Sequence, residues 1–227
     1  MNQHFNETMV VNALTAGEFS ITHSGGTVTA TSASMTASGL TVGYNGSATL
    51  SGVLRLQYSG SQLVDNQGDQ LRFKDISLGT SSADIINGAG RSTNQALIGN
   101  AGNDVITGGS GDDLLIGGLG NDTLKGGAGA DIFRFIKYET GTDTITDFNL
   151  GDGDKIDLRG LLADTGFSLD KLSLYLNLSG DLSQQTLKVD TLGSGNFGSP
   201  DLTVVMSNPS GINDGLSTLI DQRVFMV

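Results

Sequence analysis

Residues 99–134 read GNAGNDVIT-GGSGDDLLI-GGLGNDTLK-GGAGADIFR, four nine-residue segments that follow one another without a gap. They share the pattern Gly-Gly-x-Gly-x-Asp-x-apolar-x, and a degenerate copy of it lies upstream at Gly79–Asn87. Tandem repeats of this kind are typical of a solenoid, in which each repeat buries its apolar side chain only by stacking on its neighbours. The sequence therefore predicts a stack of coils.

Each repeat has two halves, a glycine-rich turn that ends at the aspartate and a three-residue strand around the apolar position. Glycine suits the turn because it reaches positive φ without strain, so that carbonyl groups can converge on an ion. Two repeats make one full coil, and turns on the same edge therefore stack about 4.8 Å apart. The predicted fold class is all-β, a calcium-binding parallel β-roll (β-solenoid) with β-rich regions capping both ends. The interior should be lined by Ile86, Leu97, Ile106, Leu115, Leu124 and Phe133.

Stacking places the repeat aspartates above one another. Asp84, Asp104 and Asp122 fall on one edge, and Asp113 and Asp131 fall on the other. Two like charges ~4 Å apart at an effective dielectric constant of ~20 repel by ~4 kcal/mol, and several such pairs exceed the ~5–15 kcal/mol stability of a typical domain. A divalent cation between successive turns reverses the sign of this energy. Because a flexible cage of hard oxygen ligands selects calcium over magnesium, the pattern predicts calcium sites along both edges.

The Asp-x-apolar element recurs outside the tandem repeats. Asp143 and Asp154 each begin such an element after the repeats, and Asp69 begins one before them. These elements are candidates for end coils that close the last sites, since exposed coil ends need polar caps. For Asp143, Asp152 and Asp154, turn formation is the competing interpretation, because Asp and Gly favour turns in any case.

The predicted calcium ligands are carboxylates and glycine carbonyls, enough for roughly four to six ions. They are Asp84, Gly102, Asp104, Gly109, Gly111, Asp113, Gly118, Gly120, Asp122, Gly127, Gly129, Asp131, Asp143 and Asp154. Among the other acidic residues nearby, we expect Asp112 to face solvent, and Asp147 and Asp157 to serve as turn or cap residues.

The repeat frame slips once, between Gly88 and Ile98, where the segment has eleven residues. Counting back from Leu97 places Gln95 at the aspartate position, where a neutral amide offers an oxygen but no charge. We expect a weak or absent calcium site there, with residues Arg91–Asn94 bulging outward.

The composition limits the partners. The 227-residue chain holds 24 acidic and 12 basic residues, and its net charge of -12 argues against nucleic acid or an anionic membrane. It has no cysteine, so bound metal would be the staple of a secreted form. No apolar run approaches the ~20 residues of a membrane-spanning helix, and residues 1–11 lack the apolar core of a cleaved signal peptide. We expect no membrane insertion and a monomer.

Catalytic signatures are missing from the sequence. His4 and His23 are the only histidines, and neither has a partner at metal or triad spacing. The motifs His-Glu-x-x-His and Gly-x-Ser-x-Gly do not occur. We therefore expect no enzymatic activity within this chain.

Three regions are expected along the chain. Residues 1–78 should form a β-rich cap or the end of a preceding domain, residues 79–157 the β-roll, and residues 158–227 a β-rich C-terminal cap. Period-two alternation predicts strands in the outer regions, and short helices are expected near residues 158–163 and 216–223. Predicted strands include Thr27–Thr31, Leu40–Tyr44, Ala48–Leu56, Leu172–Leu176 and Leu202–Met206. With no low-complexity linker, we expect one continuous β-rich body.

The repeats of Gly99–Arg134 resemble those of the RTX (repeats-in-toxin) family of type I secreted proteins. The block that follows, DTITDF from Asp143 and GDGDKIDL from Gly151, resembles the segment after the repeats in RTX adhesins and serralysin-type proteases. The later strands, down to the apolar Val224–Val227, are similar in order to the C-terminal secretion-target domain of giant bacterial RTX adhesins. The resemblance covers residues 79–227 and says little about residues 1–78.

This resemblance implies a route and a function. Such chains leave a Gram-negative cell unfolded and C-terminus first through the type I secretion machinery, with an uncleaved C-terminal signal and with further domains upstream of Met1. They fold in extracellular calcium, which is sufficient for sites with dissociation constants of ~10⁻⁴–10⁻³ M. The implied module would end a large adhesin that is secreted or held at the cell surface.

Two other interpretations remain open. Secreted proteases, lipases and alginate epimerases of the RTX type carry similar rolls, so the chain would be an accessory C-terminal module of such an enzyme, in the epimerase case with a polysaccharide-binding role. That role requires a basic stripe, whereas the basic residues are few and scattered: Arg72, Lys74, Arg91, Lys125 and Lys137. The remaining interpretation is a self-contained calcium-triggered interaction module.

Overall fold

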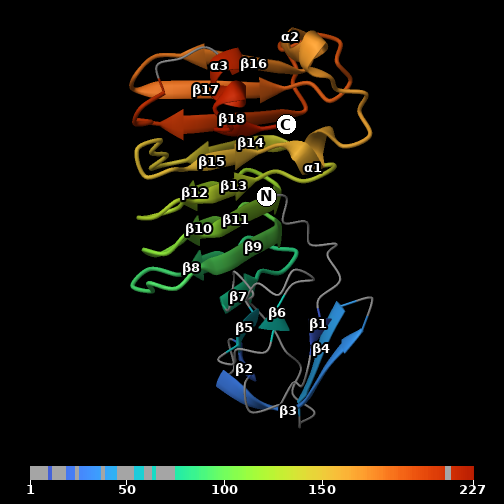
Figure 1. Ribbon diagram of the computed structural model, residues 1–227, viewed down its shortest axis with the longest axis vertical. Helices are drawn as coiled ribbons and strands as arrows, with labels where there is room; N and C mark the ends of the chain where they lie inside the picture. The colour runs from blue at the N-terminus through green and yellow to red at the C-terminus, as the bar shows by residue number, and fades with distance from the viewer. Residues whose placement is uncertain are drawn as a thin grey trace.

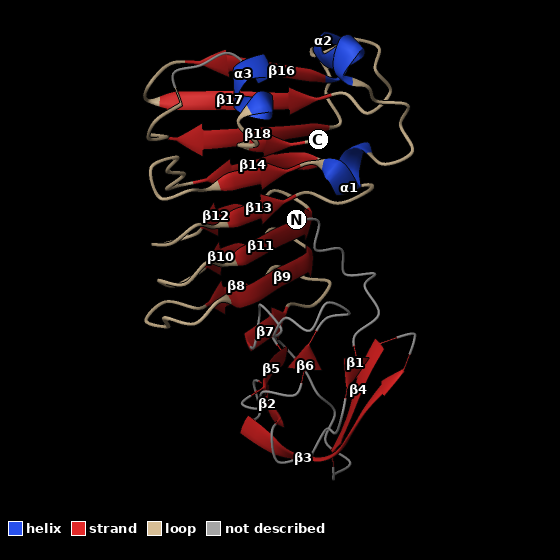
Figure 2. Ribbon diagram, viewed as in Figure 1, coloured by secondary structure: helices blue, strands red, loops and turns tan. Residues whose placement is uncertain are grey.

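The computed structural model describes residues 10–11, 19–23, 26–36, 39–44, 54–58, 63–64, 75–212 and 216–227. Its strands stack along the long axis of the molecule, with N-terminal strands at one end and C-terminal strands at the other (Figure 1). Strands dominate the described residues, and the helices among them are short (Figure 2). The all-β prediction is confirmed. None of the helices in these residues is long and apolar enough to cross a membrane.

The centre of the molecule is a parallel β-roll whose successive strands alternate between two sheets. Strands β8, β10, β12 and β14 pair in one sheet, and β7, β9, β11, β13 and β15 pair in the other. Leu97 pairs with Leu115, and Ile106 pairs with Leu124, so two nonapeptides make one coil as predicted. The strands are β7 (Asp75–Leu78), β8 (Ile85–Asn87), β9 (Gln95–Ala101), β10 (Val105–Thr107), β11 (Leu114–Leu119), β12 (Thr123–Lys125), β13 (Ile132–Arg134), β14 (Gly141–Ile145) and β15 (Lys155–Asp157).

Apolar side chains from both sheets fill the interior of the roll. All six predicted core residues are buried, with Ile86 exposed by 2% and the others by 0%. Ile145 and Ile156 continue the two columns beyond the tandem repeats. A fully buried side chain of this size stabilises the fold by ~1.5–3 kcal/mol. Because each short strand turns one such side chain inward, every coil depends on its neighbours for burial.

The C-terminal region prolongs both sheets. Strand β18 pairs in parallel with β14 and antiparallel with β17, and β19 pairs in parallel with β15. The elements are α1 (Arg159–Leu162), the 3₁₀ helix η2 (Leu169–Lys171), α2 (Leu172–Tyr175), β16 (Leu176–Gly180), β17 (Gln184–Val189), β18 (Leu202–Ser207), α3 (Leu216–Asp221) and β19 (Phe225–Met226). The two predicted helices and the predicted strand at Leu202–Met206 are confirmed.

The strand predicted at Leu172–Leu176 is wrong. Residues Leu172–Tyr175 are helical, and β16 begins only at Leu176. The helix places Tyr175 in the core, where its ring packs edge-on against Phe167 and its hydroxyl donates to the carbonyl of Thr165. Tertiary packing therefore overrides the period-two pattern at this point.

Most of the described N-terminal strands extend the sheet that contains β7. Strand β7 pairs in parallel with β9 on one side and antiparallel with β5 on the other. The strands of this extension are β2 (Phe19–His23), β3 (Gly26–Thr36), β4 (Gly39–Tyr44) and β5 (Leu54–Tyr58). Strands β1 (Val10–Val11) and β6 (Leu63–Val64) pair antiparallel in a separate two-stranded sheet. Two predicted strands lie within β3 and β4, and the third overlaps β5. Asp69, which begins the Asp-x-apolar element before the repeats, lies outside the described residues.

The frame slip is accommodated differently from the prediction. Residues Arg91–Asn94 do not bulge, because they stack on the next turn of that edge: Ser110 N donates to the carbonyl of Arg91, and Asp112 N donates to Asn94 Oδ1. The exposed extra residues are Ala89 and Gly90. Arg91 and Asn94 accept hydrogen bonds from backbone N–H groups of the adjacent turn and therefore keep their place in the stack. The two inserted residues are accommodated before them, at the start of the loop.

Candidate calcium centre

The repeat aspartates form a hydrogen-bonded column along each edge of the roll. The backbone N–H of each aspartate donates to Oδ1 of the aspartate one coil further on, at 2.7–3.0 Å. The pairs are Asp84 to Asp104, Asp104 to Asp122 and Asp122 to Asp143 on one edge, and Gln95 to Asp113, Asp113 to Asp131 and Asp131 to Asp154 on the other. The structure therefore brings all the predicted aspartates into the two predicted columns, and it places Gln95 at the predicted aspartate position.

The second oxygen of several of these carboxylates has no hydrogen-bond partner. Among the described residues, this is true of Oδ2 in Asp104, Asp122, Asp131 and Asp143, all of which are buried. A buried acceptor without a partner costs ~1–3 kcal/mol, and more if it is charged. Three of these atoms belong to the tandem repeats and the fourth, in Asp143, to the coil that follows them, and together they indicate a ligand that the protein itself does not supply.

Burial makes these carboxylates reluctant to ionise without a cation. It raises the pKa of Asp131 to about 8, and the nearby carboxylates of Asp154, Asp113 and Asp147 add to this rise. Burial also raises the pKa of Asp143 to about 7 and that of Asp122 to about 6. The pKa of Asp104 and that of Asp113 are raised for the same reason. A bound cation would restore the ionised form, because an opposite charge nearby favours it.

Glycine is required in the turns for two reasons. At Gly117 a Cβ atom would collide with Oδ2 of Asp122, so the aspartate can fold back over the turn only if that position is glycine. At Gly120 the φ angle is +139°, a conformation that other residues rarely adopt. Of the glycines predicted as carbonyl ligands, those with positive φ are Gly102, Gly118, Gly120, Gly127 and Gly129.

Gly109 and Gly111 differ from the other predicted glycine ligands. Neither has positive φ, contrary to the expectation for the turn. A Cβ atom on Gly109 would instead meet the carbonyl oxygen of Arg91, and one on Gly111 would meet the backbone of Thr93. Their role here is close packing against the irregular loop that carries the frame slip. Ligation by the predicted glycine carbonyls stays a prediction.

One end of each column is closed by protein groups. Oδ2 of Asp84 accepts hydrogen bonds from the N–H and the hydroxyl of Thr80, at 2.6 and 2.8 Å. Oδ2 of Asp154 accepts one from Asn149 N at 2.8 Å. The atoms without partners belong to other members of the columns, Asp104, Asp122 and Asp143 on one edge and Asp131 on the other, whereas Oδ2 of Asp113 accepts a hydrogen bond from Gly109 N at 2.7 Å. Calcium ligation by Asp84 and Asp154 stays a prediction.

Polar side chains that precede several of the aspartates form a second ladder, which the sequence interpretation missed. Asn121 N donates to Asn103 Oδ1, and Thr142 N donates to Asn121 Oδ1. On the other edge, Ala130 N donates to Asp112 Oδ1 at 3.0 Å. Asp112 is thus half-buried and hydrogen-bonded, and does not simply face solvent as predicted. The recurrence of Asn or Asp at this position was the available signal.

Two acidic residues cap the last glycine pairs of the array. Asp147 accepts hydrogen bonds from Gly126 N and Gly127 N at 3.0 and 2.9 Å, which agrees with its predicted capping role. Glu139 accepts one from Gly118 N at 2.9 Å and is 1% exposed. The sequence interpretation missed Glu139, although it stands four residues before Asp143, at the spacing that separates Gly118 from Asp122.

Asp157 and Asp75 hold ion pairs at the borders of the roll. Asp157, predicted as a turn or cap residue, is buried and pairs with Arg134 at 2.9 Å and with Arg159 at 2.8 Å. Although burial alone would raise the pKa of Asp157, the two guanidinium groups hold it below its usual value. Asp75 is the first residue of β7, the first strand of the roll, and pairs with Arg55.

Comparison with known proteins agrees with this geometry. The family model for the RTX calcium-binding nonapeptide repeat (4 copies) matches residues 89–124 and 98–133. The chain carries RTX calcium-binding nonapeptide repeats. They form the β-roll described above, and their turns hold the buried carboxylate oxygens without partners. An all-oxygen set of carboxylates in glycine turns fits calcium, which takes six to eight oxygen ligands in a flexible geometry.

One solved structure that is similar to the chain belongs to an enzyme. It is the solution structure of the AlgE6R3 subunit from the Azotobacter vinelandii mannuronan C5-epimerase, with 28% sequence identity and a TM-score of 0.42. The match covers 61% of this chain and 83% of that chain. At that TM-score the similarity assigns neither fold nor function. No curated protein matches the chain.

A pair of isosteric substitutions tests the column. We expect Asp104→Asn to weaken calcium binding at least tenfold, because the amide keeps the Oδ1 acceptor but replaces the unpartnered Oδ2 by an NH₂ group without charge. Asp112→Asn should change calcium affinity less than twofold, because Asp112 Oδ1 accepts a hydrogen bond from Ala130 N and Asp112 is not among the residues with a buried oxygen that lacks a partner. Calorimetric calcium titration measures both. Equal effects of the two substitutions would contradict the assigned register.

Proposed function

We propose that the chain is a non-enzymatic module that folds on extracellular calcium and directs the type I secretion of a large surface adhesin. The observation that supports calcium binding is the set of buried Oδ2 atoms without partners along the two columns, in Asp104, Asp122, Asp131 and Asp143. In the low calcium of the cytosol these carboxylates oppose folding. In millimolar calcium, sites with dissociation constants of ~10⁻⁴–10⁻³ M would fill, and the bound ions would neutralise the carboxylates that oppose folding.

The proposal for export rests on the resemblance of residues 79–227 to the secretion-target end of RTX adhesins. RTX repeats are typical of secreted proteins, and an array that stays open without calcium suits a chain that must leave the cell unfolded. In this proposal, residues 1–78 cap the roll or end a preceding domain, residues 79–157 bind calcium, and residues 158–227 hold the export signal. The working form is a monomer whose partners are calcium and the secretion machinery.

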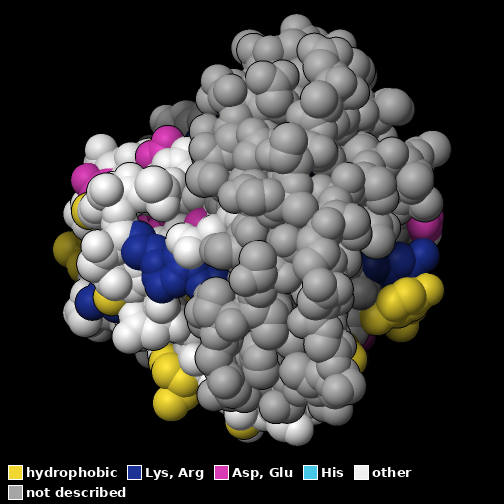
Figure 3. Space-filling view, turned by 90° about the horizontal axis from the view of Figure 1, so that it is seen from below, with side chains coloured by type: hydrophobic (Ala, Val, Ile, Leu, Met, Phe, Trp, Pro, Cys, Tyr) yellow, Lys and Arg dark blue, Asp and Glu magenta, His cyan; other side chains and the backbone are white. Residues whose placement is uncertain are grey.

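An anionic-polysaccharide module is less well supported. Arg91 lies 3.5 Å from Asp75, and Lys137 lies 3.2 Å from Asp164, so two of the five basic candidates are paired with acids. Arg72 and Lys74 lie outside the described residues. In the view of Figure 3, the coloured basic side chains lie in separate groups.

Export is tested in a Gram-negative host that carries a type I secretion system. The full chain should accumulate in the medium, and deletion of Val224–Val227 should reduce the exported fraction at least tenfold while the protein remains inside the cells. Asp112→Asn serves as the control and should be exported like the unchanged chain. Equal export with and without Val224–Val227 would contradict the placement of the signal. Long tandem repeats encoded upstream would support an adhesin, and a catalytic domain there would support a secreted enzyme.

A further inference from the structure

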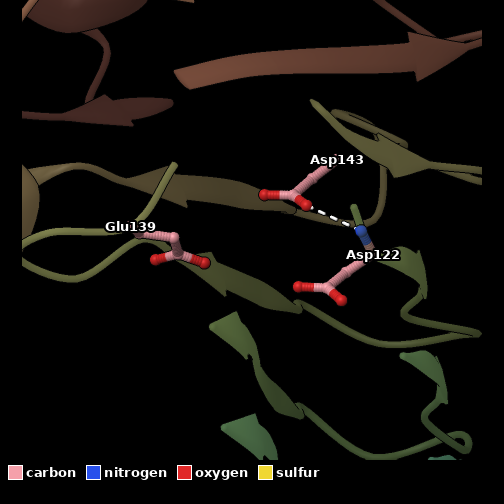
Figure 4. Close-up of side chains that lie close together, drawn as sticks. All are labelled: Asp122, Glu139 and Asp143. Carbon is pink, nitrogen blue, oxygen red and sulfur yellow. Dashed lines mark hydrogen bonds between the residues drawn. The ribbon is translucent and has the colours of Figure 1, made fainter. Parts of the chain in front are cut away.

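Three buried carboxylates converge where the tandem repeats end. Asp122 precedes β12, Asp143 lies in β14, and Glu139 lies in the loop that leads to β14. Their exposed fractions are 1%, 0% and 1%, and one oxygen of each lies within 4.8 Å of those of the other two. Figure 4 shows the carboxylates of Asp122 and Asp143 stacked beside one another, with Glu139 reaching toward them from the neighbouring loop.

Two of these carboxylates carry an oxygen without a partner. Asp122 Oδ1 accepts a hydrogen bond from Asp104 N, and Asp143 Oδ1 accepts one from Asp122 N, but Oδ2 of both is buried and has none. The charged groups that act on Glu139 are the carboxylates of Asp143 and Asp122, which repel it. A cation at this point would satisfy the orphaned oxygens and remove the repulsion.

Glu139 occupies a place that the tandem repeats give to glycine. Strand β14 pairs with β12 at an offset of 21 residues, as in Leu124 with Ile145, and the same offset aligns Glu139 with Gly118. Its Oε1 accepts a hydrogen bond from Gly118 N at 2.9 Å, and its Oε2 accepts one from Ile136 N at 2.5 Å. These bonds fix the side chain, and each carboxylate oxygen retains a further lone pair. The turn of this coil therefore adds a carboxylate at a position where the tandem repeats have no side chain.

We infer that Asp122, Glu139 and Asp143 form a three-carboxylate calcium site that closes one edge of the roll and binds calcium more tightly than the sites between nonapeptide turns. The inference rests on the proposed calcium binding. The separations of up to 4.8 Å fit an ion whose ligand oxygens lie 2.3–2.6 Å away. Calcium affinity rises with the number of charged ligands and with the rigidity of the site, and Glu139 adds to both.

Calorimetric titration of the full chain with calcium tests the inference. In the unchanged chain we expect one ion to bind more tightly than the rest. Glu139→Gln should weaken that ion at least tenfold and leave the other sites unchanged, because the amide keeps the length of the side chain but lacks its charge. Asp164→Asn is the matched control, since Asp164 is an 81% exposed carboxylate. Unchanged binding by Glu139→Gln would overturn the inference and leave Glu139 as a cap for backbone N–H groups.

A second measurement does not depend on the folding of a variant. Crystals of the unchanged chain grown with terbium, a calcium substitute, should show anomalous density in contact with Asp122, Glu139 and Asp143. Terbium in the nonapeptide turns but not between these three residues would overturn the inference and leave the proposed function intact. A chain that binds neither calcium nor terbium would instead refute the proposed function.

Discussion

Removal of calcium from the loaded chain by excess EGTA at neutral pH is expected to lower its melting temperature by about 20 °C or more. Each site filled at one hundred times its dissociation constant stabilises the folded state by ~2.7 kcal/mol. Three or more such sites contribute ~8 kcal/mol, which is comparable to the whole ~5–15 kcal/mol stability of a domain. For a chain of this size, 1 kcal/mol shifts the melting temperature by ~2–4 °C. Circular dichroism during heating measures the shift.

Magnesium provides the control for that experiment. At the same concentration it should recover only a small part of the lost stability, because it requires strict octahedral geometry at ~2.0–2.1 Å and gives up its water reluctantly. Identical melting with and without EGTA would show that the carboxylate columns are stable alone. Equal recovery by magnesium would show that the stabilisation is general screening of a net charge of -12 and not coordination.

The tandem repeats determine the central coils so strongly that the sequence alone predicted them. A strict nine-residue spacing allows one register, which brings Leu97 onto Leu115 and Asp104 onto Asp122. One apolar position per repeat then has to face inward, since each strand is only a few residues long. The same reasoning located Gln95 in spite of the inserted residues, because the count ran backward from the strand.

Prediction was incomplete where the spacing becomes irregular: Asp143 and Asp154 were named as ligands, but their places in the two columns were not. Asp143 follows Asp122 by 21 residues and Asp154 follows Asp131 by 23, so the positions that face each other in these coils are visible only once the strands are paired. Glu139 was missed for this reason. Tyr175 shows a different limit, because its helix depends on packing against Phe167, a contact that no local pattern reveals.

The metal-free chain is expected to become more stable as the pH falls from about 8 toward about 4. Burial raises the pKa of Asp131 and that of Glu139 to about 8, well above the ordinary value of ~4. Between these pH values the folded state binds more protons than the unfolded state. Stability from these groups is therefore fully present below about pH 4 and is lost as the pH rises through about 8.

Melting in calcium-free buffers across this range measures the effect, and a rise of about 10 °C between pH 7.5 and pH 5 is expected. Asp157 acts in the opposite sense, because Arg159 and Arg134 lower its pKa, and its contribution is lost only as the pH falls below about 4. In saturating calcium the slope should reverse, since protons then compete with the ion for the same oxygens. A metal-free chain whose stability falls on acidification from pH 7.5 to pH 5 would contradict the raised pKa values.

Asp131→Asn is expected to change the stability of the metal-free chain and that of the calcium-bound chain in opposite directions. The amide keeps the acceptor for Asp113 N but removes the charge that burial disfavours, so the variant should stabilise the metal-free chain at pH 7.5 by ~1–2 kcal/mol. In calcium it should destabilise the chain and weaken binding, because a ligand charge is lost. Asp112→Asn should shift neither state by more than ~0.5 kcal/mol. Destabilisation by Asp131→Asn in both conditions would mean that the carboxylate acts as a structural hydrogen-bond acceptor and that calcium does not account for its burial.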